Sequence, residues 1–388
     1  MKYSDFGPNP SGNVIQVTSG DTRHLAFVPD PLPPHLDGFE ELWEHLESAT
    51  YAVGQLAGLG RTMTNPTLFI RPFIRKEAVL SSKIEGTQTE FETLMVVEAK
   101  ERGGESVDRS SDADTREVLN YVAALEYGLE RCKTLPLSLR LLRETHERLL
   151  EGVRGENKTP GQFRTVQNWI GPRDCKPDAA TFVPPPVDEM KACLRDFEAY
   201  LHDEGKIPRL VKLAYVHYQF EAIHPFMDGN GRIGRLLLSL LTCHWDLLPV
   251  PLLYLSAYFE RNRDEYYDRL LAVSTHAAWS EWIRFFLAGV VEQANDAVER
   301  AKQLQDLQVK YREQVGRAGS SAALPRIVED LFAYPIVSVP SVGRLLDVSY
   351  QSAKYSVAKL VDEGILRELP IVARPKLYAA DAVLKLFT

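Results

Sequence analysis

The sequence predicts a mainly helical protein with a small additional module at its C-terminal end. The clearest helical spacing lies on either side of a loop at 224–235. Before this loop, the residues at helical spacing are Leu210, Leu213, Ala214, His217, Phe220 and Ile223. After it, they are Leu236, Leu237, Leu240 and Leu241. Further helical patterns cover 40–59, 69–85 and 281–315, so helices are expected over most of the chain.

Proline and glycine set the order of the elements. The residues up to Asp37 are rich in both and predict an extended arm. Helices are expected over 40–59 and 69–85, and the second of them is closed by Gly86. The polar, glycine-containing segment 101–114 predicts a loop before the next helices.

The long helical pattern at 281–315 is expected to end at Gly316, where a Gly- and Ser-containing linker begins. This order predicts four segments. They are an N-terminal arm with a helical region over 1–114, a helical core over 115–291, a helix and linker over 292–321, and a separate module over 322–388.

The loop at 224–235 is the most informative feature of the chain. Pro225 disfavours helix at His224 and helps to end the preceding helix there. Gly229 and Gly231 can take positive φ and carry no Cβ, so consecutive backbone N–H groups can turn toward one anion. The next helix begins at this point and adds its own unpaired N–H groups and the positive end of its dipole.

Four side chains give this loop a chemistry suited to nucleotides. Arg232 and Arg235 are three residues apart on one helical turn, and both can reach phosphate oxygens. Asp228 offers the hard oxygen that Mg²⁺ prefers when phosphates and water supply its other ligands. His224 is the group that can accept a proton near neutral pH.

Other interpretations of the same loop fail at particular residues. A calcium loop starting at Asp228 would have Arg232 at an oxygen-ligand position, Ile233 where Gly is required and Ser239 in place of the bidentate Glu. A Walker loop needs Ser or Thr directly after Gly-Lys, whereas the Gly205-Lys206 pair of this sequence is followed by Ile207. The remaining alternative is a glycine-rich turn with solvated arginines and a core histidine.

The loop resembles the signature of Fic-domain proteins, His-Pro-Phe-x-Asp-Gly-Asn-Gly-Arg-x-x-Arg, and every fixed position matches. The resemblance implies a mainly helical Fic core that transfers AMP from Mg²⁺-ATP to a Ser, Thr or Tyr hydroxyl of a protein, including itself, and releases pyrophosphate. It also implies roles by position. These are His224 as general base, Asp228 as the Mg²⁺ ligand, Gly229, Asn230, Gly231 and Arg232 around the α- and β-phosphates, and Arg235 on the γ-phosphate. Gly231 favours adenylyl transfer, because a related phosphorylating branch has Lys at this position.

A second motif, Ser81-x-x-x-Glu85-Gly86, lies at the end of the 69–85 helix. Alone, it would describe an ordinary surface helix with a glycine cap. Beside the loop, it resembles the inhibitory motif of the Fic family, Ser/Thr-x-x-x-Glu-Gly/Asn. The resemblance implies that Glu85 pairs with Arg235 and blocks the productive γ-phosphate position.

The segment 161–186 has β-branched and aromatic runs around a polar, proline-containing turn, and predicts a β-hairpin. The alternative to a function is a structural hairpin. In the Fic context it resembles the flap that pairs with an extended segment of the target protein. Ile170, Gly171 and the residues up to Arg173 would then border the nucleotide.

The segment 253–267 resembles the family segment near the adenine. Tyr266 is the expected contact, followed by Asn262. Tyr and Leu at these spacings are also typical of a packed core, which is the alternative.

The final segment, 322–388, predicts three helices followed by two strands at 365–370 and 376–378. It resembles a winged helix-turn-helix domain, which is found on some Fic proteins. Candidate DNA contacts on its third helix, 350–363, are Tyr350, Gln351, Ser352, Lys354, Tyr355 and Lys359. From 320 onward the net charge is only +1, so a protein-interaction or dimerisation module is the alternative.

Composition indicates a folded cytoplasmic protein. A chain of 388 residues is longer than one hydrophobic core usually supports, so two or three modules are expected. The net charge of −8 gives no overall bias toward nucleic acid. The four cysteines contain no Cys-x-x-Cys pair and suit a reducing compartment. The N-terminus lacks a signal-peptide core, and charged and proline residues interrupt the most apolar stretch, 236–255, so no membrane association is expected.

Two classes of function remain open from the sequence. The first is an autoinhibited protein adenylyltransferase that uses ATP and Mg²⁺, docks its target on the flap 161–186, and uses its C-terminal module for recruitment or for assembly such as a homodimer. The second is a DNA-binding regulator whose Fic core senses nucleotide. The presence of His224, Asp228 and Arg235 together favours catalysis, because a sensor has no need of a base.

Overall fold

A computed structural model describes residues 1–19, 22–36, 38–63, 65–105, 113–172, 174–317, 323–370 and 375–388. They form two compact units. The first unit contains residues 1–57 and 123–294, and the second contains 58–122 and 295–388. This division cuts across the segments expected from the sequence, because 58–114 belong to the same unit as the C-terminal residues.

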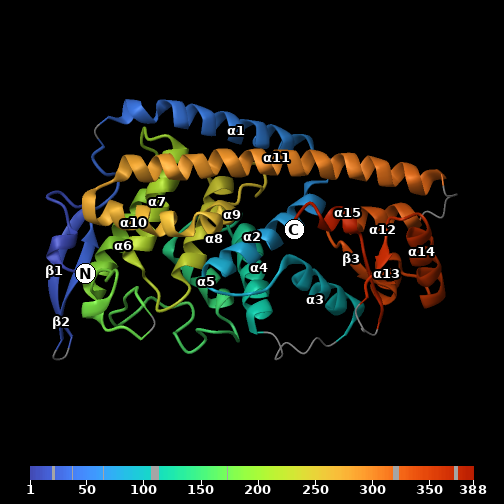
Figure 1. Ribbon diagram of the computed structural model, residues 1–388, viewed down its shortest axis with the longest axis horizontal. Helices are drawn as coiled ribbons and strands as arrows, with labels where there is room; N and C mark the ends of the chain where they lie inside the picture. The colour runs from blue at the N-terminus through green and yellow to red at the C-terminus, as the bar shows by residue number, and fades with distance from the viewer. Residues whose placement is uncertain are drawn as a thin grey trace. The chain divides into compact units, whose positions relative to one another are not determined.

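The elements of the first unit are mainly helices (Figure 1). They are η1 (Tyr3–Asp5), β1 (Gly12–Ser19), β2 (Thr22–Pro29), η2 (Phe39–Leu42), α5 (Leu139–Leu149), η3 (Pro177–Ala179), α6 (Val187–Leu201), α7 (Arg209–Ile223), α8 (Asn230–His244), α9 (Ser256–Arg261) and α10 (Arg263–His276). Three longer helices have residues in both units, namely α1 (Trp43–Thr62), α4 (Ala113–Arg131) and α11 (Trp279–Arg317).

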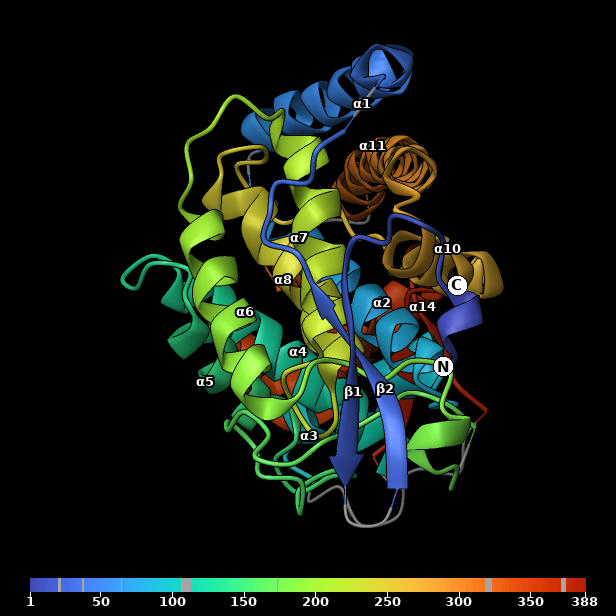
Figure 2. The ribbon, with the colours of Figure 1, turned by 90° about the vertical axis from the view of Figure 1, so that its left-hand side faces the viewer.

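Helices α7 and α8 form the centre of the first unit. Both are buried around nearly their whole circumference, as expected for helices enclosed by protein. Figure 2 shows α7 between α6 and α10, and both of these helices contact it. The indole of Trp282 on α11 donates to the carbonyl of Ala214 at 2.9 Å. The two helices predicted on either side of the 224–235 loop are therefore confirmed as the core that positions it.

The N-terminal residues are not an extended arm as predicted. β1 and β2 form an antiparallel hairpin in which Gly12 pairs with Pro29 and Ser19 pairs with Thr22 (Figure 2). The backbone N–H of Phe27 donates to the carbonyl of Val183 at 2.9 Å, so the hairpin contacts the end of the predicted flap. The β-branched run from Val14 to Thr18 favours a strand, and the glycine and proline content outweighed it in the prediction.

The second unit combines helices with a small sheet. Its elements are α2 (Pro66–Ile84), α3 (Phe91–Gly103), α12 (Ala323–Leu331), β3 (Ile336–Ser338), α13 (Val339–Leu346), α14 (Tyr350–Asp362), β4 (Arg367–Glu368), β5 (Leu377–Ala379) and α15 (Asp381–Leu384). The antiparallel sheet has the order β3-β5-β4. The sequence predicted the last two strands and missed β3, and α11 continues through Gly316 to Arg317. The predicted linker residues 318–321 and the loop residues 106–112 lie outside the described part.

The C-terminal segment of the second unit packs on α2 and α3. The ring of Phe387 lies 5.1 Å from that of Phe73 and 5.6 Å from that of Phe91. Arg102 forms an ion pair with Asp330 at 2.9 Å. The described residues 323–370 and 375–388 therefore share their core with the helix that carries the Ser81–Gly86 motif. None of the described helices is both long enough and apolar enough to cross a bilayer.

Candidate active site

The catalytic candidate His224 lies at the C-terminal end of α7 in a left-handed conformation, with φ 49° and ψ 59°. The backbone N–H of His224 donates to the carbonyl of Phe220 at 3.0 Å, which closes the helix before Pro225. Imidazole Nδ1 lies 3.3 Å from the carbonyl oxygen of Glu221. Since a carbonyl can only accept, Nδ1 carries the hydrogen in this contact, and the lone pair of the neutral ring is on Nε2. This tautomer suits a base that acts through Nε2.

Asn230 closes the loop with its side chain. Its Oδ1 accepts from the N–H of Phe226 at 2.8 Å, and its Nδ2 donates to the carbonyl of Phe226 at 2.8 Å. The residue is buried and is the first of α8. Only its backbone N–H can therefore serve the predicted phosphate cradle, together with the other N–H groups of the first helical turn.

Asp228 and the two arginines lie around this helix start. The Asp228 Oδ1 atom accepts from the N–H of Gly229 at 2.6 Å and lies 3.5 Å from a guanidinium nitrogen of Arg232. Gly229 has φ 77°, which favours glycine at the helix cap. Arg232 and Arg235 are 1% and 2% exposed, so both guanidinium groups are held inside the protein.

The residues present fit a magnesium ion that arrives with a nucleotide. Asp228 is a single carboxylate, and its side chain is one-third exposed. Within the described ranges, no cluster of three or more His, Cys, Asp or Glu side chains could hold a metal. One protein carboxylate with phosphates and water is the usual environment of Mg²⁺, which binds nucleotides without a cage of protein ligands.

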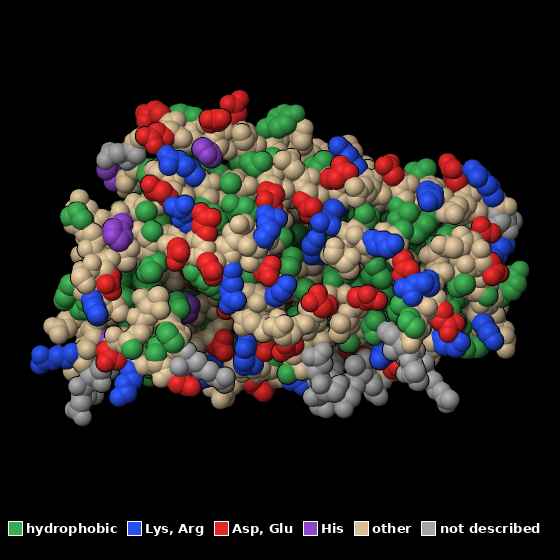
Figure 3. Space-filling view, viewed as in Figure 1, with side chains coloured by type: hydrophobic (Ala, Val, Ile, Leu, Met, Phe, Trp, Pro, Cys, Tyr) green, Lys and Arg blue, Asp and Glu red, His purple; other side chains and the backbone are tan. Residues whose placement is uncertain are grey.

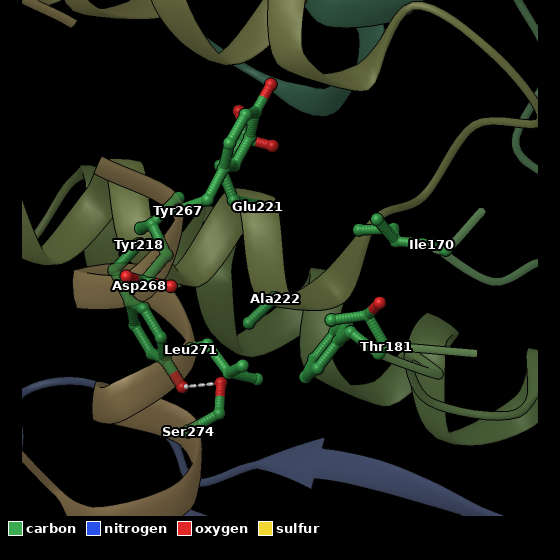
Figure 4. Close-up of a pocket in the computed structure, with 12 residues that line it drawn as sticks. Ile170, Thr181, Tyr218, Glu221, Ala222, Tyr267, Asp268, Leu271 and Ser274 are labelled. Carbon is green, nitrogen blue, oxygen red and sulfur yellow. Dashed lines mark hydrogen bonds between the residues drawn. The ribbon is translucent and has the colours of Figure 1, made fainter. Parts of the chain in front are cut away.

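A cavity of about 330 Å³ opens beside the α7 end of the loop (Figure 4). Its lining residues are Ile170, Gly171, Thr181, Phe182, Tyr218, Glu221, Ala222, Tyr267, Asp268, Leu270, Leu271 and Ser274. In Figure 4, Ile170 and Thr181 face Tyr218 and Leu271 across the cavity. The sequence predicted that Ile170 and Gly171 border the nucleotide, and in the structure both line this cavity. Arg173 lies outside the described residues.

The predicted hairpin at 161–186 is reduced to one bridge. Ile170 and Phe182 exchange backbone hydrogen bonds of 2.8 and 3.0 Å, and η3 lies between them. The prolines at 184–186 lack N–H donors and cannot extend the pairing. The sequence predicted a β-hairpin here, and in the described residues the two segments are joined by an isolated antiparallel bridge.

Tyr266 belongs to the core. It is 1% exposed, and its hydroxyl lies 2.8 Å from Nε2 of His217, whose pKa is lowered to about 3 by burial. The neighbouring Tyr267 lines the cavity. Asn262 precedes α10, and its amide donates to the carbonyl of Tyr258 at 2.9 Å, away from the cavity lining. Tyr266 is therefore packed in the core, which was the alternative to an adenine contact, and Tyr267 is the tyrosine of this pair that lines the cavity.

His146 on α5 is a site residue that the sequence did not reveal. Its Nδ1 accepts from the N–H of Gly161 at 2.9 Å, so the hydrogen is on Nε2, which donates to the carbonyl of Asp228 at 3.0 Å. The ring stacks on Phe226 at 3.8 Å. This histidine joins the base of the flap to the signature loop. Its only sequence signal is a histidine on the apolar face of an amphipathic helix, which is typical of many core histidines.

Burial lowers the pKa of His146 to about 4. Because the folded protein favours the neutral ring, the ring contributes to the free energy of unfolding. This contribution is complete above the ordinary pKa of 6.5 and is lost as the pH falls toward 4. The substitution His146→Gln keeps a donor for Asp228 and cannot titrate. Lowering the pH from 7 to 5 should reduce the free energy of unfolding by about 2 kcal/mol more in the wild type than in this variant. Urea unfolding at both pH values measures the difference, and equal losses would contradict a neutral, buried His146.

The motif Ser81–Gly86 closes α2 as expected. The helix ends at Ile84, Glu85 is its C-terminal cap, and Gly86 has φ 101°. The N–H of Gly86 donates to the carbonyl of Lys83 at 3.0 Å. Ser81 is fully buried. These residues belong to the second unit and Arg235 to the first, so the pairing of Glu85 with Arg235 stays a prediction.

Comparison with known proteins places this loop in a family. Residues 43–130 match the N-terminal segment of the Fic/DOC family, and residues 136–242 match the Fic/DOC family itself. The protein adenylyltransferase Fic of Drosophila persimilis is 30% identical over 171 residues, which are 43% of this chain and 31% of that protein. The Drosophila grimshawi protein of the same name is 28% identical over 217 residues, 55% of this chain and 40% of that protein. The chain thus spans less than half the length of these curated relatives.

The fold has a counterpart among solved structures. A Fic family protein from Desulfovibrio desulfuricans G20 has a TM-score of 0.55 and 19% sequence identity, over 90% of this chain and 98% of that one. At this identity the likeness concerns the fold alone. The family assignment rests on the sequence matches, which include the complete 224–235 loop. Over residues 43–130 and 136–242, about half of its length, the chain belongs to the Fic/DOC family.

Proposed function

We propose that this protein is an adenylyltransferase that moves AMP from ATP to a Ser, Thr or Tyr hydroxyl of a protein. The observation that carries the proposal is the position of His224 beside the N-terminal end of α8, with Nδ1 directed to a carbonyl. A hydroxyl is a poor nucleophile at its own pKa and needs a base of this kind. The curated relatives named adenylyltransferases support the same reaction class.

The groups in the site account for each bond that the proposed transfer forms or breaks. The hydroxyl oxygen forms a bond to the α-phosphorus while the bond from that phosphorus to pyrophosphate breaks, and the hydroxyl proton passes to Nε2 of His224. The N–H groups of the first turn of α8 and the buried guanidinium of Arg232 stabilise charge on the phosphates. When bound through Asp228, Mg²⁺ would add further positive charge at the leaving phosphates.

The cavity beside the loop suits the base and sugar of the nucleotide. It is mainly apolar and is bordered by Ile170 on one side and by Tyr267 on the other. Apolar and aromatic walls with a few polar groups are typical of sites for small organic ligands. The bridge between Ile170 and Phe182 would border both this cavity and a target segment docked along 161–186.

We also propose autoinhibition through Glu85. The carboxylate is expected to neutralise Arg235 and to occupy the space of the γ-phosphate, since a guanidinium and a carboxylate form a strong charge-assisted pair. The sequence supports this inhibitory pairing, because both partners occur in the chain and Glu85 directly follows α2.

Arg235→Ala tests the proposed role of Arg235 as both the γ-phosphate contact and the partner of Glu85. The substitution removes the γ-phosphate contact as well as the partner of Glu85, so AMP transfer should fall by at least about tenfold, as expected for loss of a charged phosphate contact. Adding Glu85→Gly to Arg235→Ala should not restore activity. Transfer rates of both variants and of Glu85→Gly alone measure this, and recovery in the double variant would contradict the role of Arg235.

The alternative function is a DNA-binding regulator that senses nucleotide. The feature that favours it is α14, on which Tyr350 and Tyr355 are 57% and 69% exposed, in the same unit as the two strands predicted for the wing, β4 and β5. On the face shown in Figure 3, however, basic side chains are mixed with acidic ones, whereas DNA affinity draws on a concentrated basic surface. Incubation of the Glu85→Gly protein with a cell lysate and ATP labelled at the α-phosphate separates the two. Labelled protein bands support transfer, and nucleotide binding without labelling supports the sensor.

A further inference from the structure

Arg164 is a buried cation that the proposed mechanism does not use. The residue is 1% exposed, and burial lowers its pKa to about 10. Each hydrogen bond recorded for its guanidinium ends on a backbone carbonyl, namely those of His224, Pro185, Val166 and Ile223. A buried charge is expensive unless it is well bonded, so these four carbonyls must offset much of its desolvation.

The four carbonyls come from three different segments. Val166 follows Arg164 at the start of the flap, and Pro185 lies at its other end. Ile223 and His224 end α7, where the last carbonyls of a helix lack partners within the helix. The negative end of the α7 dipole also favours a cation at this place. One guanidinium therefore holds both ends of the flap against the residue that carries the catalytic imidazole.

We propose that Arg164 is a positioning residue that fixes the backbone of His224 and joins the flap to it. The bond from Arg164 Nε to the His224 carbonyl is 3.0 Å long, and Asn168 supplies a second donor to the same oxygen at 3.3 Å. His224 has φ 49°, a region that residues other than glycine occupy at a cost. Without the clamp, the backbone can relax from this conformation and carry the ring away from the α-phosphorus.

This inference rests on the proposed function for its kinetic consequence. A base displaced by about an ångström costs on the order of a hundredfold in rate. The proposed phosphate cradle lies at the start of α8, and the printed bonds of the Arg164 side chain end on other segments. Loss of Arg164 should therefore lower kcat strongly and change the KM for ATP by no more than about twofold, the pattern of an interaction needed only in the transition state.

The test compares Arg164→Lys and Arg164→Gln with Arg143→Lys as the matched control. Arg143 also donates from Nε to a flap carbonyl, that of Gly161 at 2.7 Å, but has no bond to α7. Both Arg164 variants should lose kcat by tenfold or more, by about 1.4 kcal/mol in the barrier. The control should retain kcat. In a His224→Ala background, Arg164→Lys should cause no further loss, because the base it positions is already absent.

A second measurement follows the clamp without activity. Amide hydrogen exchange should become faster at 222–224, Phe226 and Val183 in folded Arg164→Lys, and should stay at the wild-type rate there in Arg143→Lys. Wild-type exchange in the Arg164 variants, or wild-type kcat in either of them, would overturn the inference. Equal further loss in the presence and absence of His224 would also overturn it, as a purely structural role. If the Glu85→Gly protein transfers no AMP, the proposed function fails, and the exchange experiment still decides whether Arg164 fixes the backbone of His224.

Discussion

His224→Ala should abolish AMP transfer while ATP still binds. The substitution removes the side chain that we propose accepts the proton of the target hydroxyl, and general-base catalysis is worth about 10² to 10⁴ in rate. The phosphate cradle is left in place, because its amides belong to the first turn of α8. Single-turnover transfer and calorimetric ATP binding measure the two effects separately.

His202→Ala is the matched control for this substitution. His202 lies on the surface after the end of α6, so its removal takes away an imidazole without touching the loop. It should transfer AMP at the wild-type rate. Near-normal transfer by His224→Ala at neutral pH would show that another group accepts the proton.

Glu85→Gly should activate the enzyme by as much as about a hundredfold, because a nucleotide misaligned by an ångström loses rate on this order. Removal of the carboxylate frees Arg235 for the γ-phosphate and leaves His224 undisturbed. Glu85 is the cap that follows α2, with φ −89° and ψ 2°, a conformation that glycine adopts readily. The loss of helix stability should stay below about 1 kcal/mol. AMP incorporation at equal ATP and Mg²⁺ measures the effect.

Glu90→Gly controls for the loss of a carboxylate and for a glycine near the same helix end. Glu90 is exposed and precedes α3, where glycine is also tolerated. It should leave the rate of incorporation unchanged. Equal or lower incorporation by a folded Glu85→Gly protein would reduce Ser81–Gly86 to the end of an ordinary helix.

The helical core and its loop were predictable because their signals are local. Apolar spacing defines α7 and α8, and Pro225 with Gly229 defines the chain between them. The N-terminal hairpin was missed because proline and glycine content outweighed a β-branched run. Tyr266 and Tyr267 are equivalent in sequence, and only packing against Phe259 and His217 decides which of them faces the cavity.

The contacts of His146 and Arg164 with the 224–235 loop could not be predicted from the sequence, because they carry no local signal. His146 and Arg164 lie 78 and 60 residues before His224, and both act on backbone carbonyls. A carbonyl carries no sequence signal, because every residue has one. Contacts of this kind appear only when the fold brings the segments together.

Labelling of a protein by two forms of ATP tests the central claim most directly. The purified Glu85→Gly protein is incubated with Mg²⁺ and without lysate, in one sample with ATP labelled at the α-phosphate and in the other with ATP labelled at the γ-phosphate, and label on the protein itself is measured. Adenylyl transfer predicts covalent label from the α-phosphate alone, lost in Glu85→Gly/His224→Ala. Label from the γ-phosphate, or α-label that survives removal of His224, would contradict adenylyl transfer by this site.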